Sequence, residues 1–78
     1  MKLKMKMPDL AATESEIEII RWLVEPGQAV ERGQPLVEVQ TDKAAMEVES
    51  IAVGILVETC AAPNEKVEVG KVIAIIEA

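Results

Sequence analysis

The chain is poor in the residues that build most active sites. It contains no histidine, tyrosine or phenylalanine, and one residue each of tryptophan and cysteine, Trp22 and Cys60. Without histidine, catalytic triads, most general bases and most zinc sites lack a required part. A single cysteine excludes an internal disulfide and fits a reducing compartment, the cytoplasm or, in a eukaryote, the mitochondrial matrix. We expect Cys60, on an apolar strand, to be a buried thiol that only packs, and Trp22 to fill core.

Other absences exclude further classes of protein. Asp9 and Asp42 are the only aspartates, too few for a calcium loop, and no glycine-rich phosphate loop is present. The net charge is −6, and no cluster of lysine and arginine is combined with aromatic residues, which argues against a nucleic-acid partner. No apolar run approaches the length of a membrane span, and no signal-peptide core follows the basic start. We therefore do not expect the chain to be an enzyme by itself, to bind a metal or to enter a membrane.

What the sequence does contain is the pattern of short β-strands. Over residues 2–7, lysines at even positions alternate with leucine and methionine at odd positions, which is typical of a half-buried strand. Ile19 and Ile20 are consecutive, which indicates burial on both sides or a bulge. Half of the 78 residues are hydrophobic, nearly all of them aliphatic, so we expect one aliphatic core in a single domain, residues 1–78. The expected strands are 2–7, 17–24, 29–30, 35–40, 44–48, 55–60, 67–69 and 71–77, and no segment has helical periodicity.

The sequence repeats itself with a shift of 37 residues, so that 26–34 aligns with 63–71. Strands this short bury their faces by packing sheet on sheet. We therefore predict an all-β fold, a flattened β-barrel or sandwich of two four-stranded antiparallel sheets with pseudo-two-fold symmetry. The symmetry places Lys43 at one end of the molecule and both termini at the other. The matching pairs are Pro26/Pro63, Val30/Val67, Glu31/Glu68 and Gly33/Gly70.

The centre of this pattern is a hairpin over residues 37–48 with Lys43 at its tip. Two of its features are unfavourable for stability alone. A type I′ turn needs positive φ at both central residues, for which lysine is poorly suited, and Glu38 faces Glu47 across the ladder. Because a broken local rule indicates function, Lys43 is the candidate functional residue. The expected pairs on the apolar face are Val37/Val48, Val39/Met46 and Thr41/Ala44.

The residues around Lys43 carry a resemblance to a known family. The segment VEVQTDKAAMEV over 37–48 resembles the lipoyl-lysine hairpin of lipoyl domains from 2-oxo acid dehydrogenase acyltransferases. Met7-Pro8-Asp9-Leu10 and the placing of Gly27 and Gly54, 16 residues before and 11 after Lys43, are similar to the family too. The resemblance covers nearly the whole chain and implies the barrel-sandwich hybrid fold of these domains. The proline that commonly follows the outgoing strand there is absent from Glu49-Ser50-Ile51.

The resemblance implies a swinging-arm carrier. Lys43 would hold lipoate in amide linkage, attached by a lipoate ligase or lipoyl transferase that recognises the flanks Asp42 and Ala44. The arm would accept an acyl group from a thiamine-diphosphate decarboxylase, deliver it to coenzyme A at an acyltransferase core and be reoxidised by dihydrolipoamide dehydrogenase. A pyruvate dehydrogenase complex is the default, and the isolated domain is expected to be a monomer. The loop expected to recognise partners comprises Leu10, Ala11, Ala12, Thr13, Glu14, Ser15 and Glu16.

Two other functions remain open. Biotinyl carrier domains of carboxylases share the fold and carry methionine on both sides of the modified lysine, a triplet that Met5-Lys6-Met7 reproduces. We interpret this triplet as part of the first strand, because alternation explains both methionines as core and no turn signal surrounds Lys6. The second alternative is an unmodified β-sandwich adaptor, in which Lys43 is only a solvated turn residue.

Overall fold

The computed structural model describes residues 1–10 and 16–78, and every expected strand is present within these ranges. The strand bounds differ from the predicted ones by at most two residues. None of the described residues forms a helix that is long and apolar enough to cross a membrane. The strands are β1 (Lys2–Lys6), β2 (Glu16–Trp22), β3 (Ala29–Val30), β4 (Pro35–Gln40), β5 (Ala45–Glu49), β6 (Gly54–Thr59), β7 (Lys66–Glu68) and β8 (Val72–Glu77).

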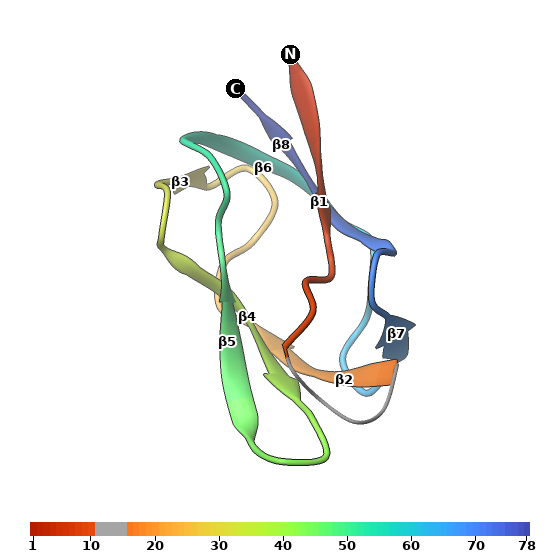
Figure 1. Ribbon diagram of the computed structural model, residues 1–78. Helices are drawn as coiled ribbons and strands as arrows, with labels where there is room; N and C mark the ends of the chain where they lie inside the picture. The colour runs from red at the N-terminus through yellow and green to blue at the C-terminus, as the bar shows by residue number, and fades with distance from the viewer. Residues whose placement is uncertain (11–15) are drawn as a thin grey trace.

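The strands form two four-stranded antiparallel sheets, in the orders β1-β8-β6-β3 and β5-β4-β2-β7 (Figure 1). This confirms the predicted fold class. β8 lies inside its sheet between β1 and β6, as its almost continuously apolar sequence predicts. The core between the sheets is aliphatic, and Trp22 packs half-buried against it with its indole N–H donating to the Ala61 carbonyl at 2.8 Å. The largest fully buried side chains include Met5, Met7, Ile17, Ile19, Leu36, Leu56, Ile73 and Ile76.

The 37-residue repeat of the sequence is also a repeat of the structure. β4 and β8 have the same length and are related by this shift. The register of β2 on β4 shifts between Ile19 and Arg21, and that of β6 on β8 shifts between Leu56 and Glu58, 37 residues later. The consecutive Ile19 and Ile20 therefore mark a bulge, which is one of the two readings that the sequence left open.

Two equivalent turns connect the two halves of the repeat, which comprise β1 to β4 and β5 to β8. Gly27 and Asn64, 37 residues apart, have φ values of 98° and 71°, a conformation that glycine and asparagine adopt more readily than other residues. The Gly27 N–H donates to the Leu56 carbonyl and the Asn64 N–H to the Ile19 carbonyl, each at 2.7 Å. Each turn thus bonds to a strand of the other half, so neither half forms a separate folding unit.

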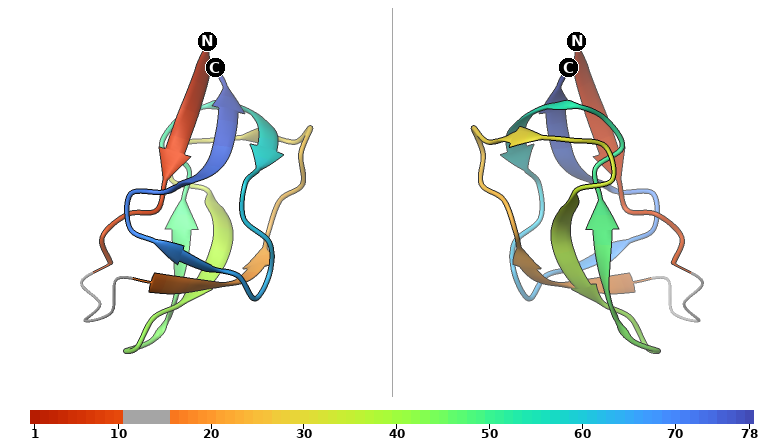
Figure 2. Two further views of the ribbon diagram at one scale, coloured as in Figure 1. Left: turned by 90° about the vertical axis from the view of Figure 1, so that its right-hand side faces the viewer. Right: turned by 90° about the vertical axis from the view of Figure 1, so that its left-hand side faces the viewer.

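The symmetry separates the hairpin tip from the termini. The molecule measures 33 × 19 × 19 Å, and both views of Figure 2 show the two termini at one end of the long axis and the tip of the β4–β5 hairpin at the other. At the terminal end the Ala78 N–H donates to the Met1 carbonyl at 2.8 Å. The predicted placing of Lys43 opposite the termini is confirmed.

Cys60 does not lie where the sequence predicts. We expected a buried thiol, and the residue is exposed. The bulge after Leu56 reverses the alternation of β6, so that Ala61 turns inward instead of Cys60. The equivalent residue of the other half, Leu23, is exposed for the same reason.

Candidate functional site

The hairpin has the predicted register. Val37 pairs with Val48 and Val39 with Met46, and three of these four side chains are buried in the core. Met46 is 38% exposed, because it lies on the edge strand β5 close to the tip. The buried valines hold the hairpin on the body of the domain, so its tip stands on a packed base.

The turn at the tip differs from the one we expected. Neither Asp42 nor Lys43 has a positive φ, so the predicted conflict between lysine and a type I′ turn is wrong. The Oγ1 atom of Thr41 accepts hydrogen bonds from the N–H groups of Lys43 and Ala44, both at 3.1 Å, and donates to the Ala44 carbonyl at 3.0 Å. This hydroxyl-capped turn accommodates a lysine without backbone strain.

The second unfavourable feature is present and is offset. Glu38 and Glu47 face each other across the ladder as predicted. Arg21 on β2 pairs with Glu38, with Nε at 3.1 Å from the carboxylate oxygen. The opposing charges reduce the repulsion between the glutamates, although a half-exposed ion pair contributes only about 0–1 kcal/mol. Neither feature of the hairpin is therefore a cost retained for function alone.

Lys43 and both its predicted recognition flanks are exposed at the tip, whereas Thr41 beneath them is 6% exposed. A hollow of about 120 Å³ lies beside the tip. Its lining comprises three carboxylate side chains, one amide, one hydroxyl and one lysine, so the surface beside the tip is mainly acidic. The lining residues are Glu16, Glu18, Gln40, Thr41, Asp42 and Lys66.

The predicted recognition loop is only partly described. Ala11, Ala12, Thr13, Glu14 and Ser15 lie outside the described residues, so their predicted role stays a prediction. Leu10 packs partly buried against the core. Glu16 opens β2 and lines the hollow beside the tip, and Glu18 two residues on pairs with Gln40 of the hairpin. The described C-terminal end of the loop therefore adjoins the site.

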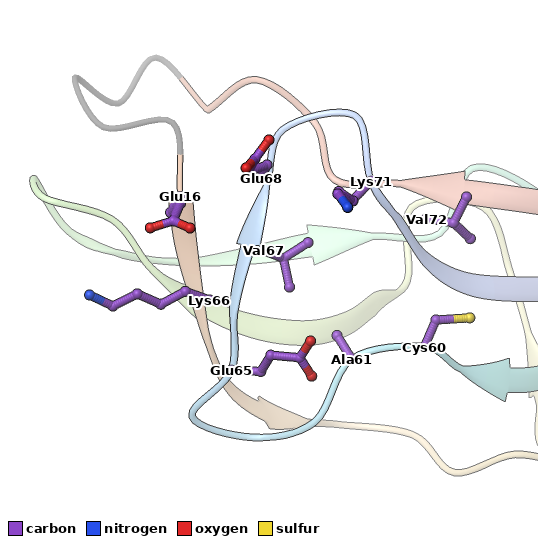
Figure 3. Close-up of a pocket in the computed structure, with 9 residues that line it drawn as sticks. All are labelled: Glu16, Cys60, Ala61, Glu65, Lys66, Val67, Glu68, Lys71 and Val72. Atoms are coloured by element: carbon purple, nitrogen blue, oxygen red, sulfur yellow. The ribbon is translucent and has the colours of Figure 1, made fainter.

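A larger pocket of about 330 Å³ contains Cys60 (Figure 3). Figure 3 shows Cys60 and Val72 toward one end of the pocket, and Glu16 and Lys66 toward the other. Partial burial and the negative charge of Glu58 raise the pKa of the Cys60 thiol above its ordinary value, so the thiol stays protonated at neutral pH. Within the described ranges, no three carboxylate or thiol side chains gather in a group that could hold a metal ion.

Sequence reasoning missed Gln40 and Thr41 as residues that shape the site. The amide of Gln40 donates to the Thr41 carbonyl at 2.8 Å, next to the bonds that the Thr41 hydroxyl makes. A hydroxyl residue two positions before an exposed turn residue is a recognised signal for such a turn. That signal was present in the sequence.

The fold and the site define a class of protein: a small all-β domain that offers one lysine at a hydrogen-bonded hairpin tip opposite its termini. The Biotin_lipoyl family model, described as "Biotin-requiring enzyme", matches residues 3–76. The chain belongs to this family of biotinyl and lipoyl attachment domains.

Curated relatives of the chain are acyltransferase components. The chain is 40% identical over 77 residues to the dihydrolipoyllysine-residue acetyltransferase component of the pyruvate dehydrogenase complex of Zymomonas mobilis. This match covers 97% of the chain and 18% of the relative. It is 40% identical over 73 residues to the succinyltransferase component of the 2-oxoglutarate dehydrogenase complex of Staphylococcus saprophyticus, over 94% of the chain and 17% of the relative. The chain thus spans less than a fifth of the length of these relatives.

A solved structure has the same fold. The solution structure of the lipoyl domain of the 2-oxoglutarate dehydrogenase complex from Azotobacter vinelandii matches with a TM-score of 0.78 at 26% identity. The match covers 97% of this chain and 96% of that one. The likeness therefore extends over a complete lipoyl domain.

Proposed function

We propose that residues 1–78 form one lipoyl domain and that Lys43 carries lipoate in amide linkage. The observation that carries the proposal is the exposed lysine at the tip of the hairpin, in a chain whose curated relatives are named for a dihydrolipoyllysine residue. The residues present fit the group, because the amine stands on an exposed turn rather than in a closed cavity. When bound, lipoate supplies a dithiolane that takes up acyl groups and reducing equivalents.

The chain's own residues fix the root of this arm. The valines at the base of the hairpin, Val37, Val39 and Val48, are buried in the core. At its tip the Thr41 hydroxyl accepts hydrogen bonds from two backbone N–H groups. Motion at the site is then left to the lysine stem, whose rotatable bonds suit a swinging arm. We propose that the domain presents the arm and leaves catalysis to its partner enzymes. Asp42 and Ala44 flank the amine as the residues that a lipoate ligase or lipoyl transferase reads.

The partners follow from the relatives' names rather than from the site. We propose that the domain works within a 2-oxo acid dehydrogenase complex, with pyruvate as the default substrate. Its partners are then a thiamine-diphosphate decarboxylase, an acyltransferase core and dihydrolipoamide dehydrogenase. The end of the recognition loop at Glu16, beside the tip, supports contact between that loop and a partner that receives Lys43. A reducing compartment, cytoplasmic or mitochondrial, stays a prediction from the single cysteine.

A biotinyl carrier is the alternative that the shared family leaves open. Lys43 is flanked by Asp42 and Ala44 and not by methionine. In the one methionine-flanked triplet, Met5 and Met7 are each 1% exposed. Lys6 between them ends β1, where it pairs with Val72 of β8. These positions match the interpretation of the triplet as strand and core, and they favour lipoate over biotin.

Intact mass spectrometry tests the proposal. The purified chain is incubated with lipoate ligase, lipoate and ATP, and in parallel with biotin ligase, biotin and ATP, and each adduct is mapped to a peptide. We expect one lipoyl increment on Lys43 and no biotinyl increment. Lys43→Arg is the matched control, which keeps the charge and should gain nothing. A biotinyl increment would indicate a carboxyl carrier, and no increment in either reaction would indicate an unmodified adaptor.

A further inference from the structure

Thr41 is one of two polar residues that are buried among the described residues, the other being Ser50. A hydroxyl group offers one donor and two acceptor positions. In Thr41 all three are used within the turn: Oγ1 accepts from the N–H groups of Lys43 and Ala44 and donates to the Ala44 carbonyl. Its bonding capacity is therefore used on the backbone of Lys43, which carries the reactive amine, and of Ala44, the residue after it.

Gln40 completes the arrangement. In a two-residue hairpin the carbonyl of the residue before the turn ordinarily accepts from the N–H of the residue after it. Here the Thr41 carbonyl accepts from the Gln40 side-chain amide at 2.8 Å, and the Ala44 N–H donates to the Thr41 hydroxyl instead. Side chains thus set the hydrogen bonding of the turn, while the bond from the Thr41 N–H to the Ala44 carbonyl at 2.9 Å keeps the strands in register.

A modifying enzyme has to distinguish Lys43 from other exposed lysines. The amines are chemically alike, so their identity has to be read from the backbone and from neighbouring groups. Lys71 also follows a turn, but there the preceding residue is Gly70 with a φ of 92°, and no hydroxyl bonds its N–H among the described contacts. The hydroxyl-bonded backbone is a feature that separates Lys43 from such a site. The other exposed lysines are Lys2, Lys4, Lys6, Lys66 and Lys71.

We propose that Thr41 is a positioning and specificity-determining residue for lipoylation, whose hydroxyl fixes the turn conformation in which Lys43 is offered to lipoate ligase. This inference rests on the proposed function. It assigns the recognition of the site to a buried hydroxyl below the tip, in addition to the exposed flanks. Any side chain that can accept from the same two N–H groups should therefore serve in its place.

The test compares the initial rates of lipoylation of the unaltered chain, Thr41→Val, Thr41→Ser and Thr41→Asn. Valine keeps the shape of threonine but not its hydrogen bonds, and we expect kcat/KM to fall about tenfold, the effect of roughly one lost hydrogen bond in the transition state. Serine keeps the hydroxyl and asparagine forms the equivalent turn, so both should stay within about threefold of the unaltered chain. Thr59→Val, the same change on β6, is the matched control and should leave the rate unchanged.

Amide hydrogen exchange supplies a readout that does not depend on the ligase. In Thr41→Val the Lys43 and Ala44 N–H groups should exchange faster, while core amides of β4 and β8 keep their protection, which also shows that the variant folds. An unaltered lipoylation rate in Thr41→Val, or an equal loss in Thr41→Ser, would overturn the inference. If the unaltered chain is not lipoylated, the proposed function fails; if it is and Thr41→Val matches it, only the role of Thr41 fails.

Discussion

At the tip of the hairpin the Thr41 N–H donates to the Ala44 carbonyl at 2.9 Å, and at the opposite end the Ala78 N–H donates to the Met1 carbonyl at 2.8 Å. The pseudo-two-fold symmetry makes these two bonds equivalent, since Ala78 follows Thr41 by 37 residues. At the terminal end the Met1 ammonium group bonds to the Ala78 carbonyl at 3.1 Å and pairs with the Glu77 carboxylate at 2.9 Å. At the tip, Asp42 and Lys43 connect the two equivalent residues, Thr41 and Ala44, through the chain.

The tip and the terminal end differ in the features that are specific to the site. The strands, bulges and cross-halves turns occur twice and therefore belong to the fold. Two features of the tip have no equivalent at the terminal end: the Asp42-Lys43 link, and the Thr41 hydroxyl that bonds the backbone of this link, where Ala78 has no hydroxyl. The ammonium group of Met1 lowers the pKa of the Glu77 carboxyl, through a hydrogen bond and through its positive charge. Both features of the tip lie at the proposed attachment site.

The largest expected effect comes from a position where two equivalent strands carry different residues. Gly54 is equivalent to Ile17, and a Cβ atom at Gly54 would overlap the carbonyl oxygen of Glu77. Gly54→Val should therefore prevent stable folding, at a cost of about 3 kcal/mol or more. Ile17→Val is the matched change in the other half and should cost about 0.5–1.5 kcal/mol. Urea unfolding followed by Trp22 fluorescence measures both, and a Gly54→Val chain as stable as the unaltered one would contradict the packing.

The strands, their register and the symmetry were predictable because period-two alternation and the repeat are written directly in the sequence. The turn type was not, because it depends on a bond from the Thr41 side chain to the backbone rather than on φ preferences. Cys60 was misplaced because a bulge, which reverses alternation, leaves no residue pattern of its own around Val57. Glycine is required at residue 54 because β8 approaches closely there, and not because of a positive φ. Close approach of a distant strand leaves no local pattern in the sequence.

An intermediate effect is expected where the halves are alike. Ile19 and Leu56 are equivalent, fully buried and next to the two bulges. Ile19→Ala and Leu56→Ala should each cost about 2–5 kcal/mol, and each variant should still unfold in one transition because the halves share a core. The measurement is again urea unfolding. A split transition, or a large cost in only one of the two variants, would mean that the halves are not energetically equivalent.

The smallest effect is expected at Cys60, whose equivalent in the other half is the exposed Leu23. Partial burial and the charge of Glu58 raise the thiol pKa, so the thiolate forms at higher pH than in an ordinary cysteine. The rate of alkylation by iodoacetamide should therefore rise with pH and level off above the pKa of a free cysteine. Glu58→Gln should shift this profile toward lower pH, because it removes a negative charge that disfavours the thiolate. A midpoint at or below that of free cysteine would contradict the assignment.

Whether the lysine is recognised by its position is tested by exchanging the two residues at the tip, in the variant D42K/K43D. Both residues are exposed, so the fold should persist, with a stability change of about 0.5 kcal/mol or less at each position. After incubation with lipoate ligase, lipoate and ATP, we expect one lipoyl group on Lys43 of the unaltered chain and none on the exchanged chain. The amine is then one residue away from the position whose N–H the Thr41 hydroxyl holds. Efficient lipoylation at residue 42 of the folded variant would contradict the claim that the lysine is read by its place on the turn.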